Sequence, residues 1–203
     1  MAQIEFWFEF ASTYSYPAAF AVEEAARVRG VELKWRAFLL GPIFGSQGWN
    51  DSPFNIYPAK GKYMWRDLAR LCAAQGLALK RPSQFPRNGL LAARISCWFA
   101  DEPWLPKFVR AVYAANFVQD QDISSPFVIG EILKSQGLMP ADIMRAAQEP
   151  ASKERLRAQT ESAIALGIIG APTFVVDGEV FWGGDRLDAA LDWALGKRAV
   201  VAI

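Results

Sequence analysis

Two stretches near the start of the chain alternate between apolar and polar residues, which is typical of β-strands. In residues 3–10 every second residue is Ile or Phe, with Glu5, Trp7 and Glu9 between them, and residues 31–38 alternate again. Ser12 or Thr13 can cap a helix between the two stretches, and Gly30 follows its end. Pro17 predicts a kink or a later start for that helix. The order strand, helix, strand predicts a βαβ unit with parallel strands.

The middle of the chain changes pattern twice. Residues 39–58 are rich in Gly, Pro, Asn and Ser, and we expect a long, ordered loop there, of the kind that tends to be functional. Helical patterns follow without a strand pattern among them, which predicts a helical insertion. They cover about 60–75, 88–100, 105–119, 126–136, 140–148 and 151–166.

The end of the chain returns to strands. Residues 173–176 and 179–182 flank Asp177-Gly178, a strong signal for a two-residue hairpin. Gly183, Gly184 and Asp185 then open a last helix, with Asp185 as its N-cap. The predicted fold class is α/β, with the order βαβ, helical block, ββα.

Composition narrows the functional classes. Apolar residues make up 52% of the 203 residues, so the chain is globular. The net charge of +1, from 22 basic and 21 acidic residues, gives no indication of a nucleic-acid or polybasic membrane partner. No stretch reaches the roughly 20 apolar residues that a membrane span needs. No signal-peptide pattern follows Met1, so we expect a cytoplasmic protein.

The residue types restrict the chemistry further. The sequence contains no histidine, which excludes a Ser-His-Asp triad, a zinc site with His ligands and a His general base. Cys72 and Cys97 form neither a CxxC motif nor a metal-binding spacing, and we expect two buried thiols and no metal. Acid–base work must therefore fall to Asp, Glu, Lys, Tyr, Ser or water.

Three short segments are candidates for a site. Ser12 lies where a strand meets a helix N-terminus, which favours anions such as a thiolate, although Ser12 can equally be a simple cap. Ala171-Pro172 permits a cis peptide that would expose backbone groups to an extended peptide, or it is a plain turn. The glycines at 183 and 184 allow a ligand to approach the backbone closely, and Asp185 can accept from an ammonium group of that ligand. Alternatively, Asp185 is only an N-cap.

These segments resemble, in this order, motifs of the 2-hydroxychromene-2-carboxylate isomerases and kappa-class glutathione transferases. Residues 8–16 read FEFASTYSY and look like the family's FDxxSPYSY. Residues 167–174 read GIIGAPTF and resemble its GVxGVPTF, and residues 180–187 read VFWGGDRL and resemble its FWGxDRL. The resemblance covers nearly the whole chain, and the last motif is the most specific.

The resemblance implies a thioredoxin-like fold with a large all-helical insertion, related to the periplasmic disulfide oxidoreductases and usually dimeric. The thioredoxin-like domain would comprise residues 1–58 and 168–203, and the insertion residues 59–167. The implied cofactor is glutathione, with its sulfur held by Ser12 beside Thr13 and Tyr14. Further glutathione-binding positions implied by the motifs are Asn55, Ala171 and presumed cis Pro172 at the cysteinyl backbone, and Gly184 and Asp185 at the γ-glutamyl end.

The implied activity is a glutathione-dependent isomerisation in the catabolism of aromatic compounds. A thiolate adds to a double bond, the resulting single bond rotates, and elimination restores the double bond. Candidate residues around the aromatic substrate are Trp49, Asn50, Arg87, Asn88 and Trp182.

Two departures from the family pattern stand out. Thr13 replaces the usual proline after the serine, and residues 39–50 contain no lysine where some isomerases have one near their acidic substrate. The second departure puts a carboxylated bicyclic substrate in question.

Two other functions fit the same residues. One is a kappa-type glutathione transferase acting on electrophiles. The other is a non-enzymatic thioredoxin-fold module that binds extended peptides around Pro172. A thiol–disulfide oxidoreductase is nearly excluded, because residues 12 and 15 are serines and not cysteines.

Overall fold

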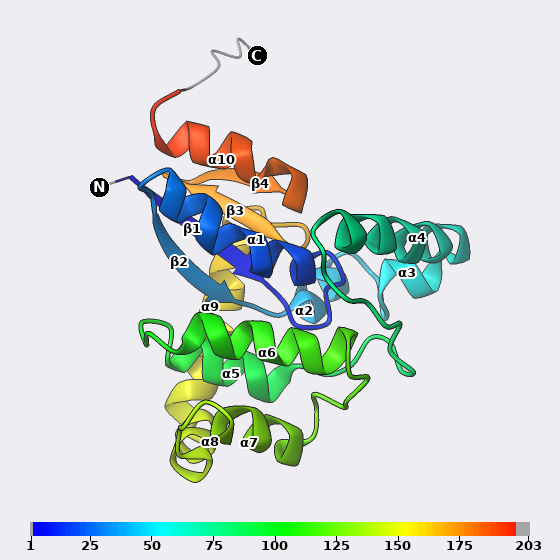
Figure 1. Ribbon diagram of the computed structural model, residues 1–203, viewed down its shortest axis with the longest axis vertical. Coiled ribbons are helices and arrows are strands. Elements are labelled where there is room, and N and C mark those ends of the chain that lie inside the picture. Colours follow the sequence, from blue (N-terminus) through cyan, green and yellow to red (C-terminus); the bar gives the residue numbers. More distant parts are fainter. Residues whose placement is uncertain (1, 198–203) are drawn as a thin grey trace.

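A computed structural model of the chain describes residues 2–197; residue 1 and residues 198–203, which belong to the first predicted domain, lie outside the described residues. Its centre is a four-stranded sheet in the order β2-β1-β3-β4 (Figure 1). The strands are β1 (Gln3–Phe8), β2 (Glu32–Ala37), β3 (Thr173–Val176) and β4 (Glu179–Trp182). As predicted, β1 and β2 are parallel. Strand β3 is antiparallel to β1 and to β4, and Asp177 and Gly178, with φ of 51° and 84°, form the predicted turn.

Helices cover both faces of this sheet. On one face, Ile4, Phe6 and Phe8 are fully buried and share a core with α1 (Ser15–Val28) and α10 (Leu187–Ala194). On the other face, Trp7 is 3% exposed and packs edge-on against Phe38, in a smaller core that includes residues of α2 (Leu40–Ser46) and α9 (Pro150–Ala165). The alternation in β1 therefore separates two buried faces, and not a buried face from a solvated one.

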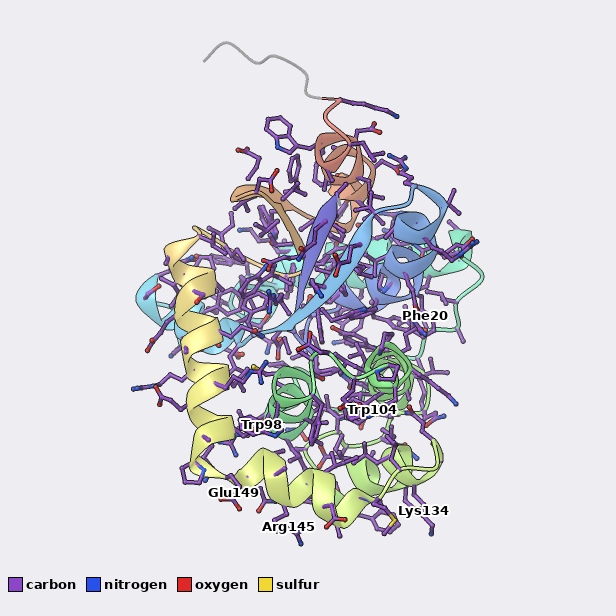
Figure 2. All side chains as sticks on the ribbon, turned by 90° about the vertical axis from the view of Figure 1, so that its left-hand side faces the viewer. Phe20, Trp98, Trp104, Lys134, Arg145 and Glu149 are labelled. Carbon is purple, nitrogen blue, oxygen red and sulfur yellow. The ribbon has the colours of Figure 1, made fainter. Side chains whose placement is uncertain are left out.

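The helical block between β2 and β3 agrees with the prediction. After α4 (Pro58–Ala74) come α5 (Leu90–Trp98), α6 (Leu105–Phe117), α7 (Pro126–Lys134), α8 (Pro140–Gln148) and α9. Four of these helices begin with proline, whose fixed φ suits the first helical position. Figure 2 shows α9 running from beside the sheet to the far end of the block, where Arg145 and Glu149 lie.

The block and the sheet share one hydrophobic core. Helix α5 contacts β2 as well as α8 and α9, and one buried cluster extends from Phe6 of β1 to Ile143 of α8. The fold is thus a thioredoxin-like sheet with a large helical insertion. Treating residues 59–167 as a separate domain remains a prediction.

Three local predictions need correction. Residues 39–58 are not a continuous loop, since they contain α2 and α3 (Pro53–Ile56). The glycines and prolines concealed this: Ser52 caps α3 by accepting from Phe54 N at 3.3 Å, and proline occupies its first position. Strand β1 ends at Phe8, so Glu9 lies in the loop that follows.

Asp185 is not the N-cap of the last helix. Gly184–Arg186 form a 3₁₀ turn, α10 begins at Leu187, and no side chain caps it. The first helix begins at Ser15, so of the predicted kink or later start the structure has the later start. Pro17 then lies in the first turn, where the N–H that it lacks would have no partner inside the helix.

Candidate active site

A large cleft opens where the carboxyl end of β1 meets the start of α1. Its volume is about 1540 Å³, above the usual range for a single small ligand. The sheet wall consists of lining residues within 9–21, 169–172 and 182–187. The helical wall consists of lining residues within 39–75 and 85–90, from α2, α3, α4 and the segment before α5. All the predicted site residues line this cleft except Asn55.

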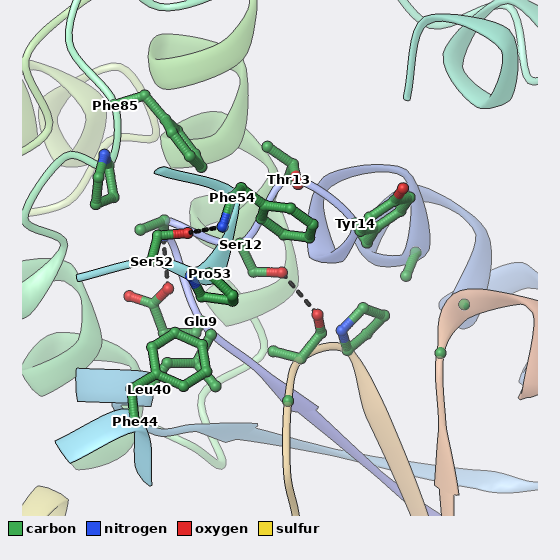
Figure 3. A pocket seen from close by; sticks show the side chains of 18 of the residues that line it. Glu9, Ser12, Thr13, Tyr14, Leu40, Phe44, Ser52, Pro53, Phe54 and Phe85 are labelled. Atoms are coloured by element: carbon green, nitrogen blue, oxygen red, sulfur yellow. Dashed lines mark hydrogen bonds between the residues drawn. The ribbon is translucent and has the colours of Figure 1, made fainter. Parts of the chain in front are cut away.

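Ser12 connects two parts of the sheet wall. Its side chain is largely buried, with 9% of the residue exposed. The hydroxyl donates to Ala171 O at 2.8 Å (Figure 3) and accepts from the N–H of Ser15, the first residue of α1, at 3.2 Å, although the N-cap position of α1 is Tyr14. The sequence offered a helix cap or an anion-binding hydroxyl: Ser12 binds the first N–H of α1 from two residues before the N-cap, and its anion-binding role stays a prediction.

Thr13 and Tyr14 turn their side chains away from the Ser12 hydroxyl. Thr13 Oγ1 donates to Met64 Sδ at 3.0 Å, and Tyr14 Oη donates to Asp67 at 3.1 Å. Burial, and then Asp67, raise the pKa of the Tyr14 phenol far above its usual value. Within residues 2–197 the backbone N–H groups of Thr13 and Tyr14 have no hydrogen-bond acceptor. These two residues therefore offer the cleft free backbone donors at a helix N-terminus.

The Ala171–Pro172 peptide is cis, and both residues line the cleft on the same wall as the start of α1, next to Ser12. Gly183 N donates to Pro172 O at 2.9 Å, which holds the residue 183–185 turn against this segment. Gly183 has φ of 112°, a conformation that favours glycine, and a Cβ there would lie 2.5 Å from Asp185 Oδ1. The predicted glutathione-binding residues of both motifs are thus adjacent in space.

Aromatic side chains make up much of the helical wall. The rings of Phe44 and Trp49 pack with centroids 5.7 Å apart, and Phe54 lies 6.2 Å from the Tyr14 ring. Trp182, which was also predicted, lines the sheet wall and is 56% exposed. Phe44 and Phe54 escaped prediction because their helices were taken for a loop.

Two predicted asparagines have local partners. Asn55 does not line the cleft, and its amide donates to the Asp51 carboxylate at 3.1 Å and to Phe85 O at 3.3 Å. Asn88 lines the cleft, and its side-chain oxygen accepts from Leu90 N at 2.8 Å at the start of α5. Asn55 therefore ties α3 to the segment before α5 and reaches a ligand only if these bonds break.

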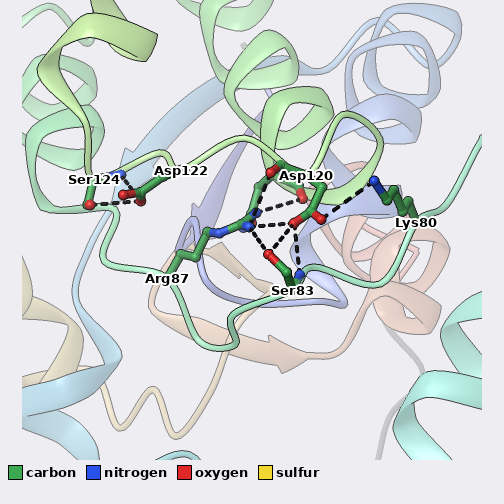
Figure 4. Close-up of polar contacts among 7 residues, drawn as sticks. Lys80, Ser83, Arg87, Asp120, Asp122 and Ser124 are labelled. Carbon is green, nitrogen blue, oxygen red and sulfur yellow. Dashed lines mark hydrogen bonds and ion pairs between the residues drawn. The ribbon is translucent and has the colours of Figure 1, made fainter.

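Arg87 reaches the cleft with its stem but not with its charge. The residue is 5% exposed, and its guanidinium forms an ion pair with Asp120 and donates to Asn116 Oδ1 at 3.2 Å and Ser83 Oγ at 3.1 Å (Figure 4). The Ser83 N–H, which donates to Asp120 Oδ1 at 2.8 Å, and then the Arg87 guanidinium hold the pKa of the Asp120 carboxyl well below its usual range. This geometry favours a structural role for Arg87 over contact with a substrate carboxylate.

Glu9 lines the cleft and was missed as a site residue. It directly follows β1, three residues before Ser12, and its Oε2 accepts from Ala11 N at 2.9 Å. Burial raises the pKa of this carboxyl to about 7, although hydrogen bonds from the backbone of Ala11 and Ser12 act in the opposite direction. The strand pattern concealed it, because Glu9 occupied a polar position in a predicted strand.

Lys60 was also missed. It lies at the start of α4, lines the cleft, and places its ammonium group 4.5 Å from the centroid of the Tyr57 ring. Among the described residues, Lys60 and Arg87 are the cationic side chains of the cleft, and only Arg87 has a carboxylate partner. Lys60 lies ten residues beyond the 39–50 segment in which a lysine was expected.

The cysteines, possible metal-binding clusters and possible membrane-spanning helices add no reactive group to the cleft among the described residues. Both cysteines are buried free thiols, as predicted, and burial raises the pKa of each to about 11. The described residues contain no group of three His, Cys, Asp or Glu side chains placed to hold a metal ion. In the same part of the chain, no helix is both long and apolar enough to span a membrane.

The fold and this site define a thioredoxin-like protein of the DsbA type. Residues 3–193 match the family model of the DSBA-like thioredoxin domain, and the chain belongs to this family. The predicted fold class is therefore confirmed.

Within that family the chain is similar to isomerases. It is 28% identical over 187 residues to a 2-hydroxychromene-2-carboxylate isomerase of Sphingobium xenophagum, covering 91% of this chain and 94% of the relative. It is 27% identical to the isomerase of the same name from Pseudomonas putida, covering 96% and 94%. A solved 2-hydroxychromene-2-carboxylate isomerase superimposes with a TM-score of 0.82 at 25% identity, covering 96% and 95%. The predicted resemblance is confirmed at this level, while the homodimer and the cytoplasmic location stay predictions.

Proposed function

We propose that this protein is a glutathione-dependent isomerase that acts on a 2-hydroxychromene-2-carboxylate or a closely related aromatic compound. The observation that carries the proposal is the convergence of Ser12, Ala171-Pro172 and Gly184-Asp185 on the sheet wall, beside the start of α1. The relatives named isomerases support the reaction type.

The sulfur of glutathione would lie at the start of α1. The free N–H groups of Thr13 and Tyr14 and the helix dipole favour a negative charge at this position and lower a thiol pKa. The Ser12 hydroxyl has one proton, which it donates to Ala171 O. Rotation about its Cβ–Oγ bond would direct that proton to the sulfur instead. Serine thus supports a thiolate that belongs to the ligand.

The rest of glutathione would extend along the sheet wall. The backbone of Ala171, next to cis Pro172, can pair with the cysteinyl backbone, and Asp185 can accept from the α-ammonium group of the γ-glutamyl end. Lys60, on the opposite wall, is the cation available for a ligand carboxylate, because Arg87 is already paired with Asp120. The absence of a lysine from residues 39–50 therefore does not rule out an acidic substrate.

The aromatic substrate would occupy the helical wall, against Phe44, Trp49 and Phe54. Addition of the thiolate converts the hindered double bond into a single bond, rotation follows, and elimination releases the thiolate with the double bond restored. The protein contributes the thiolate position, the alignment of the two ligands and exclusion of water.

The test is isomerisation of 2-hydroxychromene-2-carboxylate with and without glutathione, with calorimetry of glutathione binding. We expect glutathione binding and a rate that requires glutathione. Binding without isomerisation, but with turnover of a standard aryl halide, would favour the kappa-type transferase. Affinity for extended peptides without glutathione binding would favour the peptide-binding module. Either result removes the isomerase proposal.

A further inference from the structure

We propose that Glu9 is the proton-transfer residue of the cleft, carrying a proton between two oxygens of the substrate while its ring opens. This inference rests on the proposed isomerase function and adds to it the residue that handles the substrate's protons.

The backbone fixes Glu9 at the floor of the cleft. Its carbonyl oxygen accepts from Ser12 N at 3.1 Å and from the Tyr113 hydroxyl at 2.8 Å. One side-chain oxygen accepts from Ala11 N. Figure 3 shows the Glu9 side chain lying beside Phe44 with its carboxyl on the Ser52 side, while the Ser12 hydroxyl donates to Ala171 O. Glu9 therefore faces the part of the cleft assigned to the substrate, and Ser12 the part assigned to glutathione.

The other acidic residues of the cleft have side-chain partners. Asp51 accepts from Asn55, Asp67 pairs with Arg70 and accepts from Tyr14, and Asp185 pairs with Arg186. Within residues 2–197, Glu9 forms no ion pair and no hydrogen bond to a side chain through its carboxyl group. Since the sequence has no histidine, Glu9 is the acid in this cleft that is free to exchange a proton.

The surroundings of Glu9 place the pKa of its carboxyl near neutral pH. Burial raises its pKa to about 7, and a group with a pKa near the working pH can both accept and donate a proton. Tyr113 on α6 is the titratable group that faces it, and burial and the Glu9 charge raise the pKa of that phenol well above its usual range. The charge of Arg87, from the segment before α5, is turned to Asp120. From the helical wall, Leu40 and Phe44 of α2 bring no charge, and Asp51 is bonded to Asn55.

The proton balance of ring opening needs one such group. The substrate is a cyclic hemiketal: its hydroxyl loses a proton as the carbonyl forms, and the bond from the same carbon to the ring oxygen breaks. The ring oxygen leaves with the electron pair as a phenolate and must gain a proton. The Glu9 carboxylate takes the first proton and returns it to the phenolate, so no net proton, oxidant or reductant is consumed.

The experiment compares Glu9→Gln with the wild-type protein in the isomerase assay from pH 5 to pH 9. Glutamine keeps an oxygen for the Ala11 N–H but cannot ionise. We expect kcat to fall about 100-fold or more and to lose its ionisation near pH 7, while glutathione affinity stays unchanged. Glu5→Gln is the matched control, because Glu5 lies in β1, directly upstream of the Glu9 loop, pairs with Arg36 and does not line the cleft. It should retain the wild-type profile.

A second measurement does not depend on the Gln variant folding. A ¹³C-carboxyl NMR titration of the wild-type protein, assigned with Glu9→Asp, should show one glutamate titrating near pH 7. A Glu9 that titrates near 4.5, or a Glu9→Gln variant with the wild-type rate and pH profile, overturns the role of Glu9 and leaves the isomerase proposal intact. A wild-type protein without isomerase activity overturns both.

Discussion

The two walls of the cleft are built differently. The sheet wall places its ligand-facing groups through backbone: a helix N-terminus, the cis peptide before Pro172 and the turn at Gly183, all attached to the strands. The helical wall places side chains, such as Phe44 on the short helix α2 and Trp49 just after it, whose rings pack together. A backbone-built wall suits a constant ligand, and a side-chain-built wall suits a substrate that differs between relatives.

The largest expected effect tests the sheet wall. Ser12→Ala should lower the glutathione-dependent rate by about 100-fold or more, since a donor to a developing negative charge is lost. The measurement is kcat/KM at saturating glutathione. Ser15→Ala is the matched control, because Ser15 is fully buried and does not line the cleft. If both variants keep the wild-type rate, the thiolate is not held by the serine and the sheet wall has no special function.

The second prediction tests whether Arg87 belongs to the cleft or to the core. Arg87→Met should lower Tm by roughly 5 °C or more, because Asp120, Asn116 and Ser83 lose their shared donor. The KM for the substrate should change little. Arg66→Met, at an exposed position on α4, should leave Tm unchanged. A large rise in KM with an unchanged Tm would return Arg87 to the substrate-binding residues.

The third prediction concerns stability at the junction of the walls. The folded-state pKa of Glu9, about 7, lies above its unfolded value of about 4.5. The stabilisation of the fold by the protonated Glu9 carboxyl is therefore fully present below pH 4.5 and is lost as pH rises through 7. The free energy of unfolding of Glu9→Gln should therefore rise relative to that of wild type by on the order of 2 kcal/mol on going from pH 5 to pH 8, with allowance for partial solvent access. Urea unfolding at the two pH values measures this. An equal difference at both would contradict it.

The smallest expected effect tests the helical wall. Trp49→Ala should raise the substrate KM by about 10-fold, through lost aromatic contact, and leave glutathione affinity unchanged. Calorimetry and steady-state kinetics separate the two. Should glutathione affinity fall as much as substrate affinity, the two walls do not divide the ligands between them.

The sequence by itself determined the features that depend on local pattern. Alternation predicted β1 and β2, Asp177-Gly178 predicted the hairpin, and 3.6-residue periodicity predicted the helices of the block, because each is encoded within a few consecutive residues. The same locality explains the failures. Glycine and proline in residues 39–58 looked like loop signals, although Ser52 and Pro53 begin a short helix there.

Only the tertiary structure decided which candidates face the cleft. Arg87 was an open candidate until the chain brought Asp120, from 33 residues away, to its guanidinium. Glu9 looked like an ordinary solvated acid until the tertiary structure half-buried it in the loop after β1, where Tyr113 binds its carbonyl oxygen. Partner choice and desolvation depend on contacts between distant segments, and no local pattern records them.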